Sequence, residues 1–167
     1  MLDAHSYVSE AISKHLCELA SSMKVVVEVG VWEGKTTHAL LNACKGKVYA
    51  VDHFNGSAAS DDDTHKRSGK EKFLKNCGGF PNLTLLEMPS HDAAELFADE
   101  SVDMVFIDAG HLYEEVLDDL RCWYPKVSGV ICGHDYSYTS VRKALTEFGL
   151  YCTMPVGDYW EYTKPAK

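Results

Sequence analysis

Residues 25–40 read Val25-Val26-Val27-Glu28-Val29-Gly30-Val31-Trp32-Glu33-Gly34-Lys35-Thr36-Thr37-His38-Ala39-Leu40. The run of β-branched valines, broken only by Glu28, favours a buried β-strand that ends at Gly30. From Gly34 onwards the apolar residues recur at helical spacing. This stretch therefore predicts a strand, a glycine turn and a helix, which together form the repeating unit of α/β folds.

The same alternation continues along the chain. Further strands are predicted at residues 47–51, 83–87, 102–107 and 129–133, and helices at 4–21, 66–77, 92–97, 112–123 and 139–148. Residues 150–155 and 158–162 are expected to pair as final strands around Gly157. Several strands are largely apolar, as in a parallel sheet covered on both faces. We therefore expect an α/β fold, a three-layer Rossmann-like sandwich with a mostly parallel seven-stranded sheet and a C-terminal antiparallel strand, as one domain over residues 1–167.

The composition excludes several classes of protein. Of the 167 residues, 46% are apolar and 25% are charged, which is typical of a globular domain. No apolar run approaches the roughly 20 residues of a membrane span, and the N-terminus has no secretory features, so a cytoplasmic protein without membrane contact is expected. The net charge of −9 argues against nucleic acid as a partner. Six cysteines without a C-x-x-C pair predict neither a zinc ribbon nor a disulfide framework.

Two polar segments have open roles. Residues 66–75 carry five basic side chains, which form either a solvated helix face or a surface for an acidic group of a substrate. The loop at residues 55–64 contains Gly, Ser and three aspartates. We expect this loop to be a mobile lid that decides substrate specificity.

The glycine turn fits neither of two common nucleotide-binding patterns. A phosphate-binding P-loop needs four residues between its first glycine and the Gly-Lys-Thr triplet, and only three follow Gly30. A dinucleotide fingerprint needs a glycine at position 28, where Glu28 would place negative charge beside the pyrophosphate. Ligands of parallel sheets bind beyond the carboxyl ends of the strands. Polar residues gather at these ends: Glu28, Asp52, Ser90, His91, Asp108, His111, His134 and Asp135.

The pattern E-x-G-x-x-x-G from Glu28 to Gly34 resembles the first motif of class I S-adenosylmethionine-dependent methyltransferases. An acidic side chain suits a cofactor with an ammonium and a sulfonium group, and the glycines would make room for its amino-acid part. Asp52 follows at about 20 residues, where such folds bind the ribose hydroxyls. The resemblance implies S-adenosyl-L-methionine as cofactor, with Ser90 and His91 near adenine. The implied cofactor site comprises Glu28, Gly30, Trp32, Gly34, Asp52, His53, Ser90, His91 and Asp108.

A second set of motifs resembles one branch of this family. One strand continues as Ile107-Asp108-Ala109-Gly110-His111-Leu112-Tyr113, a helix carries Val116 with Asp119-Leu120, and a later strand ends His134-Asp135-Tyr136. These motifs are similar to small methyltransferases related to macrolide-sugar O-methyltransferases and, more distantly, to catechol O-methyltransferase, over roughly residues 25–136. The chain has Asp-Ala-Gly-His where Asp-Gly-x-His is usual. The backbone of this turn is therefore expected to differ.

Methyl transfer to an oxygen requires an aligned acceptor and removal of its proton. The resemblance implies that His111 is the general base. Asp108 and Asp135 end neighbouring strands, about 4.8 Å apart, so their carboxylates could share a divalent cation such as Mg²⁺. Because Tyr136 replaces an asparagine ligand of catechol O-methyltransferase, the third ligand would be His134, His53 or water. Without a metal, both aspartates would bond only to backbone and solvent.

The sequence thus predicts an S-adenosylmethionine-dependent O-methyltransferase for a small hydroxylated acceptor, such as a sugar or a phenol. Two other hypotheses stay open: a nucleotide-binding oxidoreductase that binds NAD(H), and a silent module that binds the cofactor without turnover. Since no extra substrate-binding domain is visible, a homodimer could complete the acceptor pocket. Aromatic residues that could line it, although most are expected in the core, are Trp32, Phe54, Tyr136, Tyr138 and Trp160.

Overall fold

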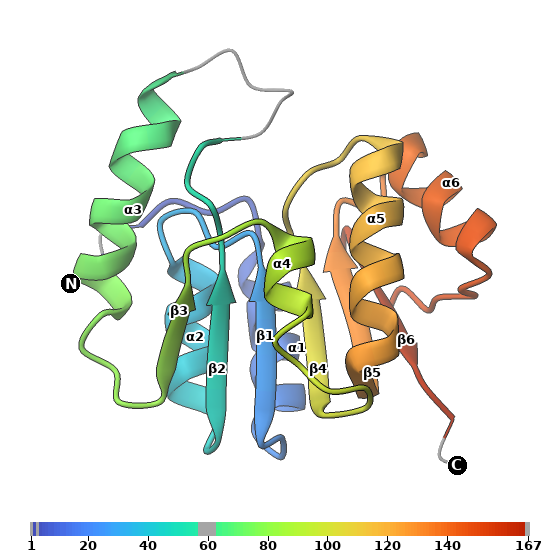
Figure 1. The fold of residues 1–167 in the computed structure, drawn as a ribbon, viewed down its shortest axis with the longest axis horizontal. Helices are drawn as coiled ribbons and strands as arrows, with labels where there is room; N and C mark the ends of the chain where they lie inside the picture. Colours follow the sequence, from blue (N-terminus) through green and yellow to red (C-terminus); the bar gives the residue numbers. More distant parts are fainter. Residues whose placement is uncertain (1, 3, 57–62, 166–167) are drawn as a thin grey trace.

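A computed structural model of the chain describes residues 2, 4–56 and 63–165, with backbone alone for residues 63–68. It contains a six-stranded sheet in the order β3-β2-β1-β4-β5-β6 (Figure 1). The first five strands run parallel, and β6 is antiparallel to β5. The strands are β1 (Val25–Val29), β2 (Lys47–Val51), β3 (Leu83–Leu86), β4 (Val102–Ile107), β5 (Val127–His134) and β6 (Tyr159–Thr163).

Helices cover both faces of the sheet and so form the outer layers of a sandwich (Figure 1). Helices α4 (Ser90–Ala94), α5 (Tyr113–Trp123) and α6 (Thr139–Phe148) lie on one face. Helices α1 (Glu10–Ala20) and α2 (Lys35–Ala43) lie on the other, with α3 (Asp63–Cys77) beside them. A short 3₁₀ turn, Tyr124–Lys126, leads into β5. The predicted three-layer Rossmann-like fold is confirmed.

Each face of the sheet has its own apolar core, because successive side chains of a strand point to opposite faces. In β1, Val27 packs among the residues of α5 and α6, whereas Val26 packs among those of α1 and α2. Both side chains are fully buried. This explains why β1 is an almost unbroken valine run rather than an alternating one: neither face is available to water.

Two helix boundaries differ from the prediction for local reasons. The first helix was expected from residue 4 but begins at Glu10, because Ser9 adopts an extended backbone and its side chain accepts a hydrogen bond from the Ile12 N–H. The helix expected at residues 92–97 is the short α4, which ends at Ala94. Residues 4–9 are thereby left outside the helix, with a bend at residues 7 and 8.

The prediction of seven strands is wrong, since the sheet has six. Residues 150–155 were expected to pair with the last strand, but only Thr153 does so, through an isolated bridge to Glu161. Tyr151 is 89% exposed and Pro155 lacks an N–H to donate, so this segment has little to gain from lying on the sheet. The other predicted final strand, residues 158–162, corresponds to β6.

Strand order places the ligand-binding end of the sheet. The chain passes from β1 outwards to β2 and β3, and then returns to the other side of β1 as β4. At such a switch point the connections diverge and leave a crevice beyond the carboxyl ends of the strands. Within the described ranges, every helix is too short or too polar to cross a bilayer.

Candidate functional site

A cavity of about 1260 Å³ lies at the carboxyl ends of the parallel strands. It exceeds the upper range of single small-ligand pockets, roughly 1000 Å³, so it offers room for two ligands side by side. Nearly every residue predicted to bind a cofactor, a metal or the transferred proton lines it: Glu28, Gly30, Trp32, Asp52, His53, Ser90, His91, Asp108, His111, His134 and Asp135. Gly34 does not belong to the cavity wall.

The two glycines of the turn are explained first by packing within the protein. Gly30 has a φ of +84°, and a Cβ there would lie 2.4 Å from the Asp108 carbonyl oxygen. Gly34 has a φ of +83°, and its Cβ would lie 2.8 Å from the Cys77 Sγ on α3. Both positions require a left-handed backbone that only glycine adopts without strain. Gly30 also lines the cavity, whereas Gly34 brings α2 close to α3.

Glu28 is a buried carboxyl with an unsatisfied oxygen. Its side chain is 1% exposed, and its Oε2 has no hydrogen-bond partner among the described residues. Burial raises the pKa of this carboxyl well above its ordinary value; the neighbouring Thr37 hydroxyl lowers it, and the nearby Asp108 and Asp52 raise it further. A buried polar atom without a partner is costly, so a donor from a bound molecule would be favourable at this place.

Asp52 holds the glycine turn in place. Its Oδ2 accepts hydrogen bonds from the Val31 and Trp32 N–H groups at 3.0 and 3.1 Å, and its Oδ1 accepts one from Phe54 at 2.7 Å. The carboxylate thus stabilises Trp32, whose φ of 44° is unusual for a bulky residue. Next to it, the His53 Nδ1 accepts a hydrogen bond from the Asn55 N–H. Both side chains line the cavity, and their role in ribose binding stays a prediction.

Sequence reasoning missed that the N-terminal segment forms part of the cavity wall. The buried Glu33 accepts hydrogen bonds from the His5 N–H at 2.7 Å and from the Lys72 Nζ at 2.7 Å. Although burial opposes it, these bonds lower the pKa of Glu33 below its ordinary value. Tyr7 stacks on Trp32 at 5.7 Å between ring centroids. No periodic pattern in the sequence predicts the position of this N-terminal segment, because the segment is held by single contacts with residues far away in the sequence.

The role of the basic stretch at residues 66–75 was left open between a solvated helix face and a surface for an acidic substrate group. The ion pairs of Lys70 and Lys72 help to decide between them. Besides Lys72, which binds Glu33, Lys70 lies 2.7 Å from Glu87. Two of the five basic side chains are therefore neutralised within the protein, while those of Lys66 and Arg67 are outside the described residues. The predicted lid at residues 55–64 also falls largely outside them, since residues 57–62 are not described.

Ser90 begins α4 and is already engaged by side chains of α5. Its hydroxyl donates to the Asp119 Oδ1 at 2.5 Å and accepts from the Trp123 Nε1 at 2.8 Å. Burial raises the pKa of Asp119 to about 6. The next residue, His91, is largely exposed and lies 3.1 Å from the Asp92 carboxylate. Asp119 belongs to the helix motif with Val116 and Leu120, and no role was predicted for it from the sequence.

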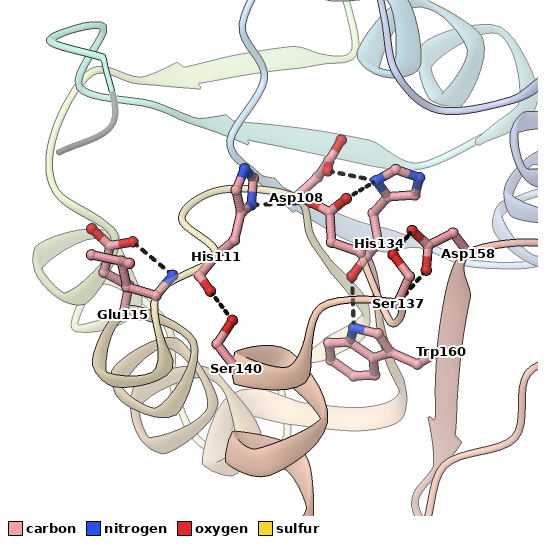
Figure 2. Close-up of polar contacts among 10 residues, drawn as sticks. Asp108, His111, Glu115, His134, Ser137, Ser140, Asp158 and Trp160 are labelled. Carbon is pink, nitrogen blue, oxygen red and sulfur yellow. Dashed lines mark hydrogen bonds and ion pairs between the residues drawn. The ribbon is translucent and has the colours of Figure 1, made fainter. Parts of the chain in front are cut away.

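Four side chains at the ends of β4 and β5 form a linear chain of contacts (Figure 2). The His111 Nδ1 lies 3.0 Å from the Asp135 Oδ2, and the Asp135 Oδ1 lies 3.0 Å from the His134 Nδ1. The same His134 nitrogen lies 3.5 Å from the Asp108 Oδ1. The order is therefore His111, Asp135, His134, Asp108. Both aspartates therefore contact histidines, which differs from the alternative of contact with backbone and solvent alone.

Mutual contacts and burial shift the pKa values of all four groups in this cluster. The hydrogen bond to Asp135 raises the pKa of His111. Burial alone would lower the pKa of His134, but its bonds to Asp108 and Asp135 raise it to about 10. Burial opposes ionisation of Asp135, yet both histidines hold its pKa below the ordinary value. Burial raises the pKa of Asp108. These contacts favour a cationic His134 beside an anionic Asp135.

The turn after β4 is held by the start of α5. The Glu115 Oε2 accepts a hydrogen bond from the Leu112 N–H at 3.3 Å, and a Cβ on Gly110 would lie 2.1 Å from that oxygen. The Asp-Ala-Gly-His sequence therefore places its glycine where the capping glutamate needs room. The His111 carbonyl also accepts a hydrogen bond from the Ser140 hydroxyl at 2.6 Å (Figure 2). These contacts fix His111 at the cavity rim, where its side chain is 40% exposed.

The loop after β5 is fixed from β6. Asp135 has a φ of 61°, a strained conformation for a non-glycine residue. Asp158, just before β6, accepts hydrogen bonds from the Ser137 N–H and hydroxyl at 2.5 and 2.7 Å. The Trp160 Nε1 donates to the His134 carbonyl at 3.1 Å (Figure 2). Trp160 is thus core, as expected of most aromatic residues, whereas Tyr138 lines the cavity and stacks on His111.

Potential metal ligands converge at the same place. One ligand atom each from Asp108, His134 and Asp135 lies within 4.8 Å of the others. Of the three predicted candidates for a third ligand, the described residues bring His134 to the two aspartates, while His53 is not part of this group. Carboxylate oxygens are the ligands that Mg²⁺ and Mn²⁺ prefer. The donor set therefore fits a divalent cation, although the same atoms also satisfy one another through ion pairs.

Comparisons with known proteins agree with this geometry. Residues 27–136, about two thirds of the chain, match the family described as a methyltransferase domain. The chain therefore belongs to this methyltransferase family, and the resemblance to class I S-adenosylmethionine-dependent methyltransferases is confirmed. The matched residues include both strand-end clusters, from Glu28 to Asp135. No significant match was found among curated proteins.

Solved structures share the fold at low sequence identity. The O-methyltransferase NovP is 19% identical with a TM-score of 0.74, and the match covers 97% of this chain and 83% of NovP. An S-adenosylmethionine-dependent O-methyltransferase from Thermotoga maritima is 15% identical with a TM-score of 0.64, covering 98% of this chain and 68% of that one. A precorrin 8W decarboxylase from Methanobacterium thermoautotrophicum reaches 0.65 at 19% identity, covering 96% and 93%. The shared fold alone thus does not define the acceptor.

Proposed function

We propose that this single-domain chain transfers the methyl group of S-adenosyl-L-methionine to a hydroxyl oxygen of a small acceptor, such as a sugar or a phenol. One observation carries the proposal: His111, held by Asp135, lies at the rim of the same cavity that contains the motif residues Glu28 and Asp52. A candidate base and a candidate cofactor site thus share one space. The family match supports methyl transfer, and NovP is an O-methyltransferase by name.

The residues around the glycine turn fit the proposed cofactor. The unpaired Glu28 Oε2 is a buried acceptor in a cavity wall, which suits a ligand that carries an ammonium group. Asp52 already accepts three backbone hydrogen bonds and, with four lone-pair sites on its carboxylate, has room for about one more. When bound, S-adenosyl-L-methionine supplies a methyl group on a sulfonium centre. The protein's contribution is to exclude water and to align the acceptor oxygen with that methyl group.

His111 would serve as the general base. Because its Nδ1 lies against the Asp135 carboxylate, the tautomer with a proton on Nδ1 is favoured and the Nε2 lone pair is left for the acceptor hydroxyl. Removal of the hydroxyl proton by Nε2 accompanies the new carbon–oxygen bond as the carbon–sulfur bond breaks. The proton then resides on His111, where the Asp135 carboxylate stabilises the imidazolium. Tyr138, stacked on His111 at 5.3 Å, would restrict the ring to this orientation.

The second part of the proposal is a divalent cation held by Asp108, His134 and Asp135. Such a cation would bind the acceptor hydroxyl and lower its pKa. Since the His134 Nδ1 would have to lose its proton to become a ligand, we expect cation binding to release protons and to strengthen as pH rises. Titration of Mn²⁺ into the chelator-treated protein tests this part: binding that is lost in Asp108→Asn supports it, and no binding up to millimolar Mn²⁺ contradicts it.

Charge in the cavity supports a neutral or cationic acceptor. Eight carboxylate residues line the described wall, whereas Lys35 is the one lysine or arginine there. A phosphorylated acceptor would be repelled by such a surface. This balance agrees with the predicted sugar or phenol and with the prediction that nucleic acid is not a partner. The predicted homodimer stays a prediction.

The proposal can be tested by transfer of a radiolabelled methyl group from S-adenosylmethionine to a panel of sugars and phenols, with and without a chelator. Label in a hydroxylated acceptor, with its loss in His111→Ala, is the expected result. If the protein binds the cofactor but labels no acceptor of the panel, and nitrogen or carbon acceptors are labelled instead, the hydroxyl assignment is wrong. If chelation leaves the rate unchanged, the metal plays no part in catalysis.

A further inference from the structure

The first turn of α6 contacts both of the loops that carry the candidate base and its carboxylate partner. The Ser140 hydroxyl donates a hydrogen bond to the His111 carbonyl oxygen at 2.6 Å (Figure 2). Two positions further along, the Arg142 guanidinium donates to the carbonyl oxygens of Tyr136 and Ser137 at 2.9 and 2.5 Å. His111 follows β4, whereas Tyr136 and Ser137 follow the neighbouring strand β5. One helical turn therefore holds both loops.

This turn is well fixed in the protein. A serine near the start of a helix often bonds to the backbone of its own helix, but the single hydroxyl proton of Ser140 goes to another loop. Val141, the next residue, is 3% exposed, and it packs in the core with Ala144 and Leu145 of the same helix. The Ser140 donor thus sits on an element that the core holds in place, which favours a precise position.

The segment at residues 135–140 holds His111 from two directions. The Asp135 Oδ2 lies 3.0 Å from the His111 Nδ1, and the Tyr138 ring stacks on the imidazole. From the other side, Ser140 binds the His111 carbonyl. Asp135 has a φ of 61°, a strained conformation that persists only with support from its surroundings. A shift of α6 relative to the loop after β4 would therefore change the distance between the imidazole and the carboxylate.

We propose that Ser140 and Arg142 are positioning residues, which act through the backbone of the two loops to set the contact between the His111 imidazole and the Asp135 carboxylate. The inference rests on the proposed function and deepens it. Neither side chain belongs to the described cavity wall, so neither is placed to act on a ligand. Asp135 keeps the proton of the neutral imidazole on Nδ1 only within hydrogen-bond range. A misplacement of about 1 Å can cost about a hundredfold in rate.

Helix α6 offers matched variants. Ser140→Ala removes the donor to the His111 carbonyl, whereas Ser140→Thr keeps a hydroxyl at the same carbon. Thr146→Ala is the control, because the Thr146 hydroxyl also donates to a backbone carbonyl, that of Arg142 at 2.8 Å, but this bond lies within the helix. Arg142→Met keeps an apolar stem and removes the hydrogen bonds to the loop after β5. The two loops can thus be released one at a time.

The test combines steady-state kinetics with NMR of the His111 ring nitrogens, recorded on chelator-treated protein at a pH at which the ring is neutral. The wild-type ring should carry its proton on Nδ1. In Ser140→Ala, the tautomer with a proton on Nε2 should become detectable. Its kcat should fall about tenfold, because one lost hydrogen bond shifts the loop by only a fraction of an ångström, while KM for S-adenosylmethionine stays within about twofold.

The other variants should separate positioning from a general effect on the helix. Ser140→Thr should restore both the tautomer and kcat, and Thr146→Ala should change neither. Arg142→Met should resemble Ser140→Ala. An unchanged tautomer in Ser140→Ala, with or without a fall in kcat, overturns the positioning role, and so does an equal change in Thr146→Ala. A wild-type ring protonated on Nε2 also overturns it, because Asp135 then does not orient the imidazole.

Failure of the proposed function gives a different result. If the tautomer changes in Ser140→Ala and turnover stays the same, His111 is not the base, while the positioning of its ring by α6 stands. If the wild-type protein transfers no methyl group to any acceptor, the NMR spectra alone decide between positioning and its absence.

Discussion

The two halves of the cavity hold their polar side chains in different ways. At the ends of β1 and β2, the Asp52 carboxylate accepts hydrogen bonds from three backbone N–H groups. At the ends of β4 and β5, side chains bond to one another in the order His111, Asp135, His134 and Asp108. In the first half, backbone N–H groups hold the carboxylate, and in the second half, side chains hold one another.

The two halves of the cavity are therefore suited to different tasks, namely ligand binding in the first half and proton transfer in the second. Backbone hydrogen bonds to Asp52 hold the glycine turn in one conformation, as suits a site that must fit a ligand of fixed shape. The His111–Asp135 pair joins two titratable side chains, which is the arrangement that the proposed proton transfer requires. Substitutions on the first side should therefore act mainly on folding and affinity, and those on the second side mainly on turnover and its pH dependence.

The largest effect is expected for His111→Ala. We expect kcat to fall by about a hundred- to ten-thousandfold, because removal of a general base costs a rate factor of this size, while the affinity for S-adenosylhomocysteine stays within about threefold. Steady-state kinetics and calorimetry measure the two quantities. His38→Ala is the control, since His38 contacts Asn42 and Phe80 outside the cavity wall. Unchanged turnover in His111→Ala would remove this residue from the catalytic role.

Gly30→Ala should strongly destabilise the glycine turn that follows β1. The new Cβ would lie 2.4 Å from the backbone oxygen of Asp108, just after β4, at a φ of +84°, so we expect a loss of more than about 3 kcal/mol in the free energy of unfolding. Gly149→Ala is the control, because Gly149 has a φ of +88° but no atom within 4 Å of the added Cβ. Its loss should be about 1 kcal/mol, from strain alone. Equal losses in urea unfolding would contradict the close packing at Gly30.

Asp119→Asn should stabilise the protein in a pH-dependent way. Burial raises the pKa of Asp119 from 3.8 to about 6, so the folded state binds this proton more tightly than the unfolded state. Its favourable contribution is complete below pH 3.8 and is lost as the pH rises through about 6. The variant, which has no charge to bury, should exceed the wild type by about 2 to 3 kcal/mol at pH 8 and match it near pH 4. An equal difference at both values, in urea unfolding, would contradict the assignment.

Asp135→Asn should shift the pH profile of turnover. The Asp135 carboxylate raises the pKa of His111, so its removal should lower that pKa and bring the neutral, basic form of His111 to lower pH. The acidic limb of the profile should move to lower pH, and kcat should fall about tenfold because the ring loses its orienting partner. NMR titration of His111 in chelator-treated protein checks the pKa directly. A pKa that stays constant or rises would contradict the pairing.

The sequence was sufficient for the fold class and for the positions of the candidate site residues at the ends of strands, because these depend on local patterns. Apolar strand runs and the glycine turn placed Glu28, Asp52, Asp108 and Asp135 at the ends of strands, and topology then brought them together. The prediction of a strand at residues 150–155 was wrong. A short sequence pattern cannot distinguish a fully paired strand from a segment with a single bridge, as at Thr153.

Long-range partnerships could not be predicted in the same way. The bond of Glu33 to His5, the stacking of Tyr7 on Trp32 and the Ser90–Asp119 pair join residues 25 or more positions apart. Nothing in their immediate sequence distinguishes them from surface residues. The internal bonds of Asp52 likewise follow from the conformation of the turn, which the pattern E-x-G-x-x-x-G indicates only in outline.

The central claim, that this cavity binds S-adenosyl-L-methionine, is tested most directly by calorimetric titration of the purified protein with S-adenosylmethionine and S-adenosylhomocysteine, with NADH and ATP as competitors of different chemistry. We expect micromolar binding of the first two at one site per chain and no binding of NADH or ATP. Preference for NADH, or no binding of either S-adenosyl compound, would contradict the account.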